Sequence, residues 1–78
     1  MSDQTPTPRP PHKTQAERHL DAAAEYGSDA AMHVQNAIRH GQDGNAMGQN
    51  IELTDAAVAV FRGQVELVRA EWARKESR

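Results

Sequence analysis

The sequence predicts an all-α fold, a long antiparallel helical hairpin that we expect to be completed by dimerisation into a four-helix bundle. Three observations lead to this prediction. All four prolines lie within residues 1–13, so no proline interrupts a helix after them. Apolar or small residues then recur every three or four positions in two long segments. Residues 41–53, a segment rich in glycine and asparagine, separate the two and predict a loop.

The first helix is predicted over residues 15–40. Thr14 and Glu17 have the spacing of a capping box, in which each side chain accepts a hydrogen bond from the other residue's amide. Small or apolar residues at positions 20, 27, 34 and 41 keep one phase, so we expect Gly27 to lie on the packed face of a continuous helix. A break at Gly27 is the alternative. It would give a compact three-helix monomer with helices near residues 15–26, 29–40 and 54–75.

The second helix is predicted over residues 54–75, with Thr54 as its N-cap and Asp55 in a first turn that favours an anion. Two apolar stripes follow, and together they span about 180° of the helix surface, which is wider than one partner helix can cover. The first, which we expect to face the first helix, comprises Val58, Phe61, Val65, Val68 and Trp72. The second comprises Leu53, Val60 and Leu67.

The second stripe needs a cover that a lone hairpin cannot provide. A second copy of the chain is the simplest one, and a different protein is the alternative. Gln64 and Glu71 fall within the apolar arc, where a polar pair can fix the register of two helices or can lie at the rim of the contact. Trp72 is expected to pack in the core, or to anchor a partner if it is exposed. The candidate interface residues are Val60, Gln64, Leu67, Glu71 and Trp72.

Three histidines, His19, His33 and His40, share a seven-residue phase that Tyr26 completes. Residues seven apart on a helix are about 10 Å apart along its axis, so two of these histidines cannot bind one metal ion unaided. A metal site would need a carboxylate from the other helix or from a second chain, such as Glu66 or Glu71. The simpler interpretation is a row of half-exposed histidines beside the apolar face, so we expect no metal or other cofactor.

Composition sets limits on function. The 78 residues have room for one small domain, residues 14–78, preceded by a proline-rich tail, residues 1–13, that we expect to be disordered. The absence of cysteine excludes a disulfide framework and a cysteine nucleophile. A net charge of −2 argues against nucleic-acid binding. No apolar run approaches the roughly 18 residues of a membrane span, and we expect a cytoplasmic protein.

These observations favour a non-enzymatic protein–protein interaction or regulatory module that acts through an apolar helix surface. Its partner would be itself, as a homodimer, or another protein. The sequence has no nucleophile–base pair and no cofactor motif, so we do not expect an enzyme. Two alternatives stay open. One is a small nucleic-acid-associated helical bundle, and the other is a metal-binding bundle that uses His19, His33 and His40.

Overall fold

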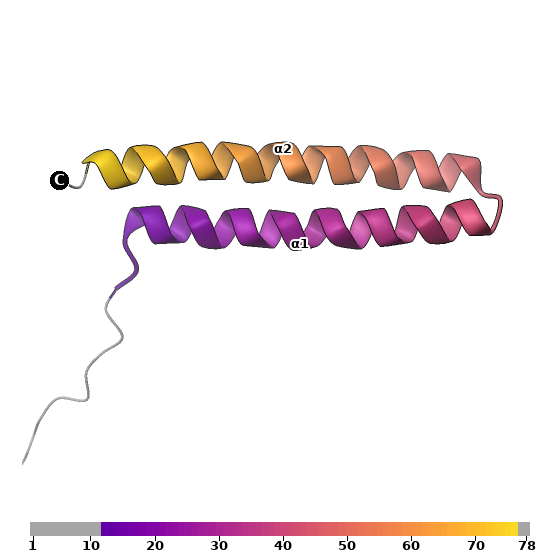
Figure 1. Ribbon diagram of the computed structural model, residues 1–78, viewed down its shortest axis with the longest axis horizontal. Coiled ribbons are helices and arrows are strands. Elements are labelled where there is room, and N and C mark those ends of the chain that lie inside the picture. The colour runs from indigo at the N-terminus through magenta and orange to yellow at the C-terminus, as the bar shows by residue number, and fades with distance from the viewer. Residues whose placement is uncertain (1–11, 77–78) are drawn as a thin grey trace, which may run out of the picture.

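The computed structural model describes residues 12–76, which form two antiparallel helices joined by a short turn (Figure 1). Helix α1 is Gln15–Gln42 and helix α2 is Ala46–Glu76, and the described residues contain no strand. The prediction of an all-helical hairpin is therefore confirmed. With 28 and 31 residues, the helices are about 42 and 46 Å long. The predicted disordered tail, residues 1–13, lies outside the described residues except for His12 and Lys13.

Helix α1 begins with the predicted capping box. The Glu17 amide donates to Thr14 Oγ1 at 3.1 Å, and the Thr14 amide donates to Glu17 Oε1 at 2.8 Å. The helix runs without a break through Gly27, so the three-helix alternative is wrong. Within the hairpin, the expected packing at Gly27 is not made by α2. Gly27 is exposed, and a Cβ atom there would have nothing within 4 Å.

The turn between the helices is a Schellman motif. Gly44 adopts a φ of 74°, in the left-handed region that favours glycine, just after the end of α1. The Gly44 amide donates to the carbonyl of Gly41 at 3.1 Å, and the Asn45 amide donates to the carbonyl of His40 at 2.8 Å. These two bonds satisfy carbonyl groups that the end of a helix otherwise leaves open.

Helix α2 begins at Ala46, eight residues before the predicted start at Thr54. Asn45 takes the capping role, because its Oδ1 accepts a hydrogen bond from the Gly48 amide at 2.9 Å. Thr54 lies exposed inside the helix and is not an N-cap. The predicted loop of residues 41–53 is therefore wrong, since only the three residues from Asp43 to Asn45 connect the helices.

The buried part of the contact between α1 and α2 consists of small residues. Its buried members are Ala30 and Ala37 on α1, and Ala56, Ala59, Gly63 and Ala70 on α2. Small side chains allow two helix backbones to approach closely, and at Gly63 a Cβ atom would already lie 3.5 Å from the Cβ atom of Tyr26. No large apolar side chain is fully buried among residues 12–76.

The prediction that the first apolar stripe of α2 faces α1 is wrong. Within that stripe, Phe61 is 64% exposed and Trp72 is 61% exposed. The stripe lies on the side of α2 away from α1, because alanine and glycine residues at the same helical spacing occupy the side that packs. We call this surface the outer stripe. It comprises Met47, Ile51, Val58, Phe61, Val65, Val68 and Trp72.

Candidate functional site

One broad side of the hairpin, formed by both helices, is apolar. Shallow grooves run along it: one is lined by residues that include Gly27 and Leu67, and a second brings Leu20 of α1 beside Leu67 of α2. Val34 is in the same seven-residue phase as Leu20 on α1, and Leu53 is in the same phase as Leu67 on α2; these two side chains are 43% and 48% exposed. We call this surface the flat face. It comprises Leu20, Gly27, Val34, Leu53, Val60 and Leu67.

The structure brings four of the five candidate interface residues to the flat face or its border. Val60, Gln64 and Leu67 line one groove together. Glu71 lines the neighbouring groove beside Leu67, and its half-exposed side chain lies 3.8 Å from Lys75. Trp72 lies apart from these four, on the outer stripe.

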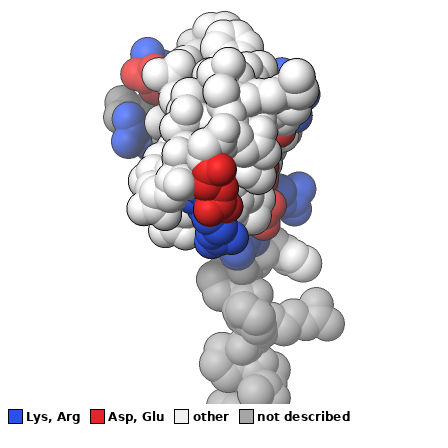
Figure 2. Space-filling view, turned by 90° about the vertical axis from the view of Figure 1, so that its right-hand side faces the viewer, with Lys and Arg blue, Asp and Glu red and all other residues white. Residues whose placement is uncertain are grey.

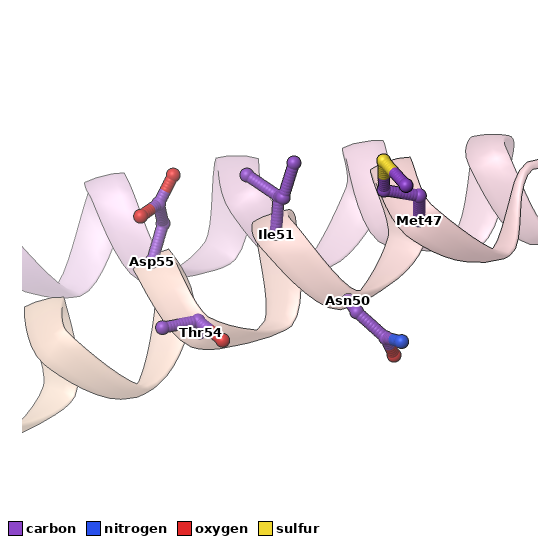
Figure 3. A pocket seen from close by; sticks show the side chains of 5 residues that line it. All are labelled: Met47, Asn50, Ile51, Thr54 and Asp55. Carbon is purple, nitrogen blue, oxygen red and sulfur yellow. The ribbon is translucent and has the colours of Figure 1, made fainter.

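The outer stripe belongs to α2 alone. At its end near the turn, Met47 and Ile51 border an open groove whose other lining residues are Asn50, Thr54 and Asp55, all from the same helix (Figure 3). Viewed from the turn, most of the visible surface is uncharged, and charged side chains gather toward its sides and lower part (Figure 2). Large apolar side chains of α2 are exposed on two different sides of this helix, the flat face and the outer stripe.

Two histidines of α1, His19 and His33, contact carboxylates of α2. Their side chains are therefore more than a half-exposed row beside the apolar face. His19 Nδ1 lies 2.6 Å from Glu66 Oε1, and the exposed fractions of the two side chains are 28% and 13%. Arg69 donates to the other carboxylate oxygen of Glu66 at 3.0 Å. The hydrogen bond with His19, together with the charge of Arg69, holds the pKa of Glu66 below its ordinary value.

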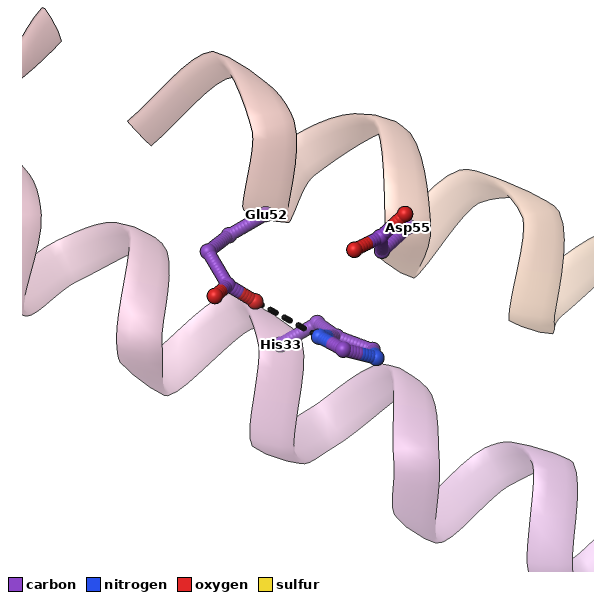
Figure 4. A group of neighbouring side chains, drawn as sticks. All are labelled: His33, Glu52 and Asp55. Carbon is purple, nitrogen blue, oxygen red and sulfur yellow. Dashed lines mark hydrogen bonds and ion pairs between the residues drawn. The ribbon is translucent and has the colours of Figure 1, made fainter. Parts of the chain in front are cut away.

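A second pair lies two heptads further along α1. His33 Nδ1 and Glu52 Oε1 are 2.6 Å apart, with Asp55 on the next turn of α2 (Figure 4). The hydrogen bond with Glu52 raises the pKa of His33, and the same bond lowers the pKa of Glu52. A hydrogen bond from Asn36 also lowers the pKa of Glu52.

His40 ends the row, with its Nδ1 3.3 Å from Asn45 Nδ2. Each histidine of the row therefore has its own neighbour from beyond α1, and no two of them meet. That two histidines seven residues apart cannot bind one metal ion unaided stays a prediction. A site that uses His19, His33 and His40 together is not formed within the hairpin.

Sequence reasoning named His33 and Glu66 but missed Glu52 and the role of Asp55. Glu52 fell within the predicted loop, and Asp55 was assigned to the first turn of a helix that begins earlier. A usable signal was present: Glu52 and Glu66 are two heptads apart, as are His19 and His33. Two helices that pack in an antiparallel register would bring both pairs together.

Comparison with protein-family models, curated proteins and solved structures found no match. Among the described residues, neither helix combines the length and apolar character needed to cross a membrane.

Proposed function

We propose that this chain is a non-enzymatic interaction module that pairs with a second copy of itself through the flat face. The observation that carries this proposal is the outward placement of the large apolar side chains. Those on the flat face are between 43% and 52% exposed, while the contact inside the hairpin uses alanine and glycine. Soluble monomers seldom expose a contiguous apolar surface of this extent without a partner.

The size of the flat face suits a dimer. The side of the hairpin that carries the flat face is about 42 Å long and about 20 Å wide, which gives about 800 Å², and the flat face itself extends over about 21 Å of that length. A stable protein–protein interface of standard size buries about 800 Å² on each partner. Pairing two such faces would build the four-helix bundle expected from the sequence.

The details of the flat face also favour a second hairpin. Gly27 lies near the middle of α1, and nothing stands within 4 Å of the place where its Cβ atom would be. The groove beside it, lined by Val60 and Leu67, can accept side chains from an opposing helix. Gln64 lines the same groove, where a polar side chain can pair with its copy and fix the register of the two chains.

The outer stripe is the other surface through which two copies could pair, and the structure favours the flat face. The outer stripe belongs to one helix, so pairing there would leave Leu20 and Val34 of α1 uncovered. The flat face takes side chains from both helices, so pairing two copies through it would cover Leu20 and Val34. Pairing through it leaves the outer stripe open to a different protein.

Two adjacent residues of similar exposure test the proposal by sedimentation equilibrium. Leu67, which is 52% exposed, lies on the flat face, and Val68, which is 46% exposed, lies on the outer stripe. We expect Leu67→Glu to reduce the mass from that of a dimer to that of a monomer, because a charge would be buried at the contact. Val68→Glu, the matched control, should keep the dimer mass.

Other outcomes contradict the proposal. A Leu67→Glu chain with the wild-type mass would exclude the flat face as the contact. Loss of the dimer in the Val68→Glu chain alone would assign the contact to the outer stripe. Circular dichroism of both variants checks that each chain keeps its helices.

A further inference from the structure

We propose that His33, Glu52 and Asp55 form a binding site for a divalent transition-metal ion, best suited to Zn²⁺, between α1 and α2. One ligand atom of each residue lies within 4.8 Å of the others. Glu52 and Asp55 are three residues apart on α2, so both carboxylates project toward the same side of that helix (Figure 4). This site goes beyond the proposed function and does not depend on dimerisation.

The His19–Glu66 pair can be compared with the His33–Glu52 pair of the proposed site. His19 and Glu66 form a pair in the same register as His33 and Glu52, with the same distance of 2.6 Å. The difference lies three residues further along α2. Arg69 follows Glu66 and lies 3.0 Å from its second carboxylate oxygen. At the equivalent place after Glu52, the chain has the opposite charge, Asp55.

The net charge around the two histidines therefore differs: among the described residues, His33 has only carboxylates acting on it, whereas the Glu66 carboxylate beside His19 is paired with Arg69. Asp29, Glu52 and Asp55 all act on His33. Asp55 has no hydrogen bond or ion pair within the part of the chain that the structure describes. The Asp55 carboxylate lies next to the His33–Glu52 pair and has no cationic side chain of residues 12–76 bound to it. A divalent cation would therefore be stabilised between these three side chains. The Glu66 carboxylate already has a guanidinium partner in Arg69.

The donor set selects the class of metal. Ca²⁺ and Mg²⁺ prefer oxygen ligands alone, whereas one imidazole nitrogen with two carboxylates suits Zn²⁺ and related transition metals. Metal–ligand distances of about 2.0–2.2 Å in a tetrahedral site put neighbouring ligand atoms roughly 3.3 Å apart. Side-chain rotation can reach this spacing, since all three side chains are partly exposed. Water would take the fourth position, and the opening to solvent gives the ion a path in.

Asn36 supports the site from the same side of α1. It donates a hydrogen bond to Glu52, so the carboxylate is oriented by a neighbour that is not a proposed ligand. Such outer hydrogen bonds commonly fix the direction of metal-binding carboxylates. An ion held here would connect α1 to α2 about 15 Å along the helices from the turn.

Isothermal titration of the full chain with Zn²⁺ tests the proposal. We expect one equivalent bound per chain, and at least a tenfold loss of affinity in each of His33→Asn, Glu52→Gln and Asp55→Asn. The control variant His19→Asn, at the equivalent pair, should bind like the wild type. Tetrahedral visible absorption of the Co²⁺ form should appear in the wild type and disappear in Asp55→Asn.

A gain-of-site variant protects the test against variants that fold poorly. Arg69→Asp gives the His19–Glu66 pair the arrangement of the proposed site, and we expect it to raise the stoichiometry to two ions per chain. The proposal is overturned if the wild type does not bind Zn²⁺, or if His33→Asn binds as tightly as the wild type. A loss in His19→Asn equal to that in His33→Asn would also overturn it. Half an equivalent per chain would place the ion between two copies and contradict a site within one hairpin.

Discussion

Truncating the only phenylalanine of this chain should cost less stability than enlarging one alanine. Phe61 is 64% exposed, so about a third of its surface is buried. Full burial of such a side chain contributes about 1.5–3 kcal/mol, and a third of that is about 0.5–1 kcal/mol. We therefore expect Phe61→Ala to lower the free energy of unfolding by about 0.5–1 kcal/mol. A phenylalanine in a core would cost about 3–5 kcal/mol.

Ala37→Leu should have the larger effect, although it adds apolar surface. Ala37 is 2% exposed and faces α2, and its carbonyl accepts a hydrogen bond from the Gln49 side chain at 3.3 Å. A leucine there has to push the helices apart or adopt a strained rotamer. Adding carbon atoms to a closely packed contact costs about 1–3 kcal/mol.

Urea denaturation followed by circular dichroism measures both changes. The protein concentration has to be the same for all chains, because the apparent stability of the proposed dimer would depend on concentration. A loss of about 3–5 kcal/mol in Phe61→Ala, together with no loss in Ala37→Leu, would refute the assignment of small residues to the hairpin contact. It would place the outer stripe against α1, as the sequence alone suggested.

Two further predictions concern the start of α2 and a histidine–carboxylate pair. Asn45→Ala should lower the free energy of unfolding by about 1 kcal/mol, because it removes the acceptor for the Gly48 amide. Thr54→Ala should be neutral or stabilising by up to about 0.7 kcal/mol, because Thr54 lies inside the helix. The reverse order of the two effects in urea denaturation would contradict the start of α2 at Ala46. With a chelator present, the melting-temperature difference between wild type and Glu52→Gln should be largest between about pH 4.5 and 6.5. The contribution of the pair is lost at lower pH as Glu52 is protonated through its lowered pKa, and at higher pH as His33 is deprotonated through its raised pKa. A difference that does not vary with pH would contradict the pairing.

Local signals in the sequence were sufficient for the first helix. The Thr14–Glu17 spacing defines its start through two hydrogen bonds between near neighbours, so no tertiary information is needed. The constant phase of small and apolar residues through Gly27 correctly predicted an unbroken helix. The seven-residue spacing of His19, His33 and His40 likewise placed them in one row.

The start of α2 could not be predicted from composition, because the glycines near the end of α1 and the start of α2 have different roles. One allows the turn, and others lie in helices where a neighbouring side chain packs closely against the backbone. Of the five glycines, all of which lie within residues 12–76, only Gly44 has a positive φ. A Cβ atom at Gly41 would overlap Gln49 Nε2, and one at Gly48 would overlap Asn45 Nδ2. These glycines make room for neighbouring side chains within helical backbone. Glu52 was missed as a partner of His33 for the same reason, since it lay in the predicted loop.

Hydrophobicity also pointed to the wrong packed face of α2. A pattern based on apolar character ranks Phe61 and Trp72 above Ala56 and Ala59, yet the alanines pack against α1. Close approach of two backbones depends on small side chains at regular spacing. Large apolar residues then remain exposed on the outside, and the proposed pairing of two copies would cover those on the flat face.

Isotope-filtered nuclear Overhauser spectroscopy on a mixture of labelled and unlabelled chains tests the central claim most directly, because it reports only contacts between copies. The account predicts contacts between chains from the methyl groups of Leu20, Val60 and Leu67 on the flat face. It predicts none from the methyl groups of Val58 and Val68 on the outer stripe. Contacts between chains from the outer stripe alone, or none at all at concentrations where the chain is folded, would contradict pairing through the flat face.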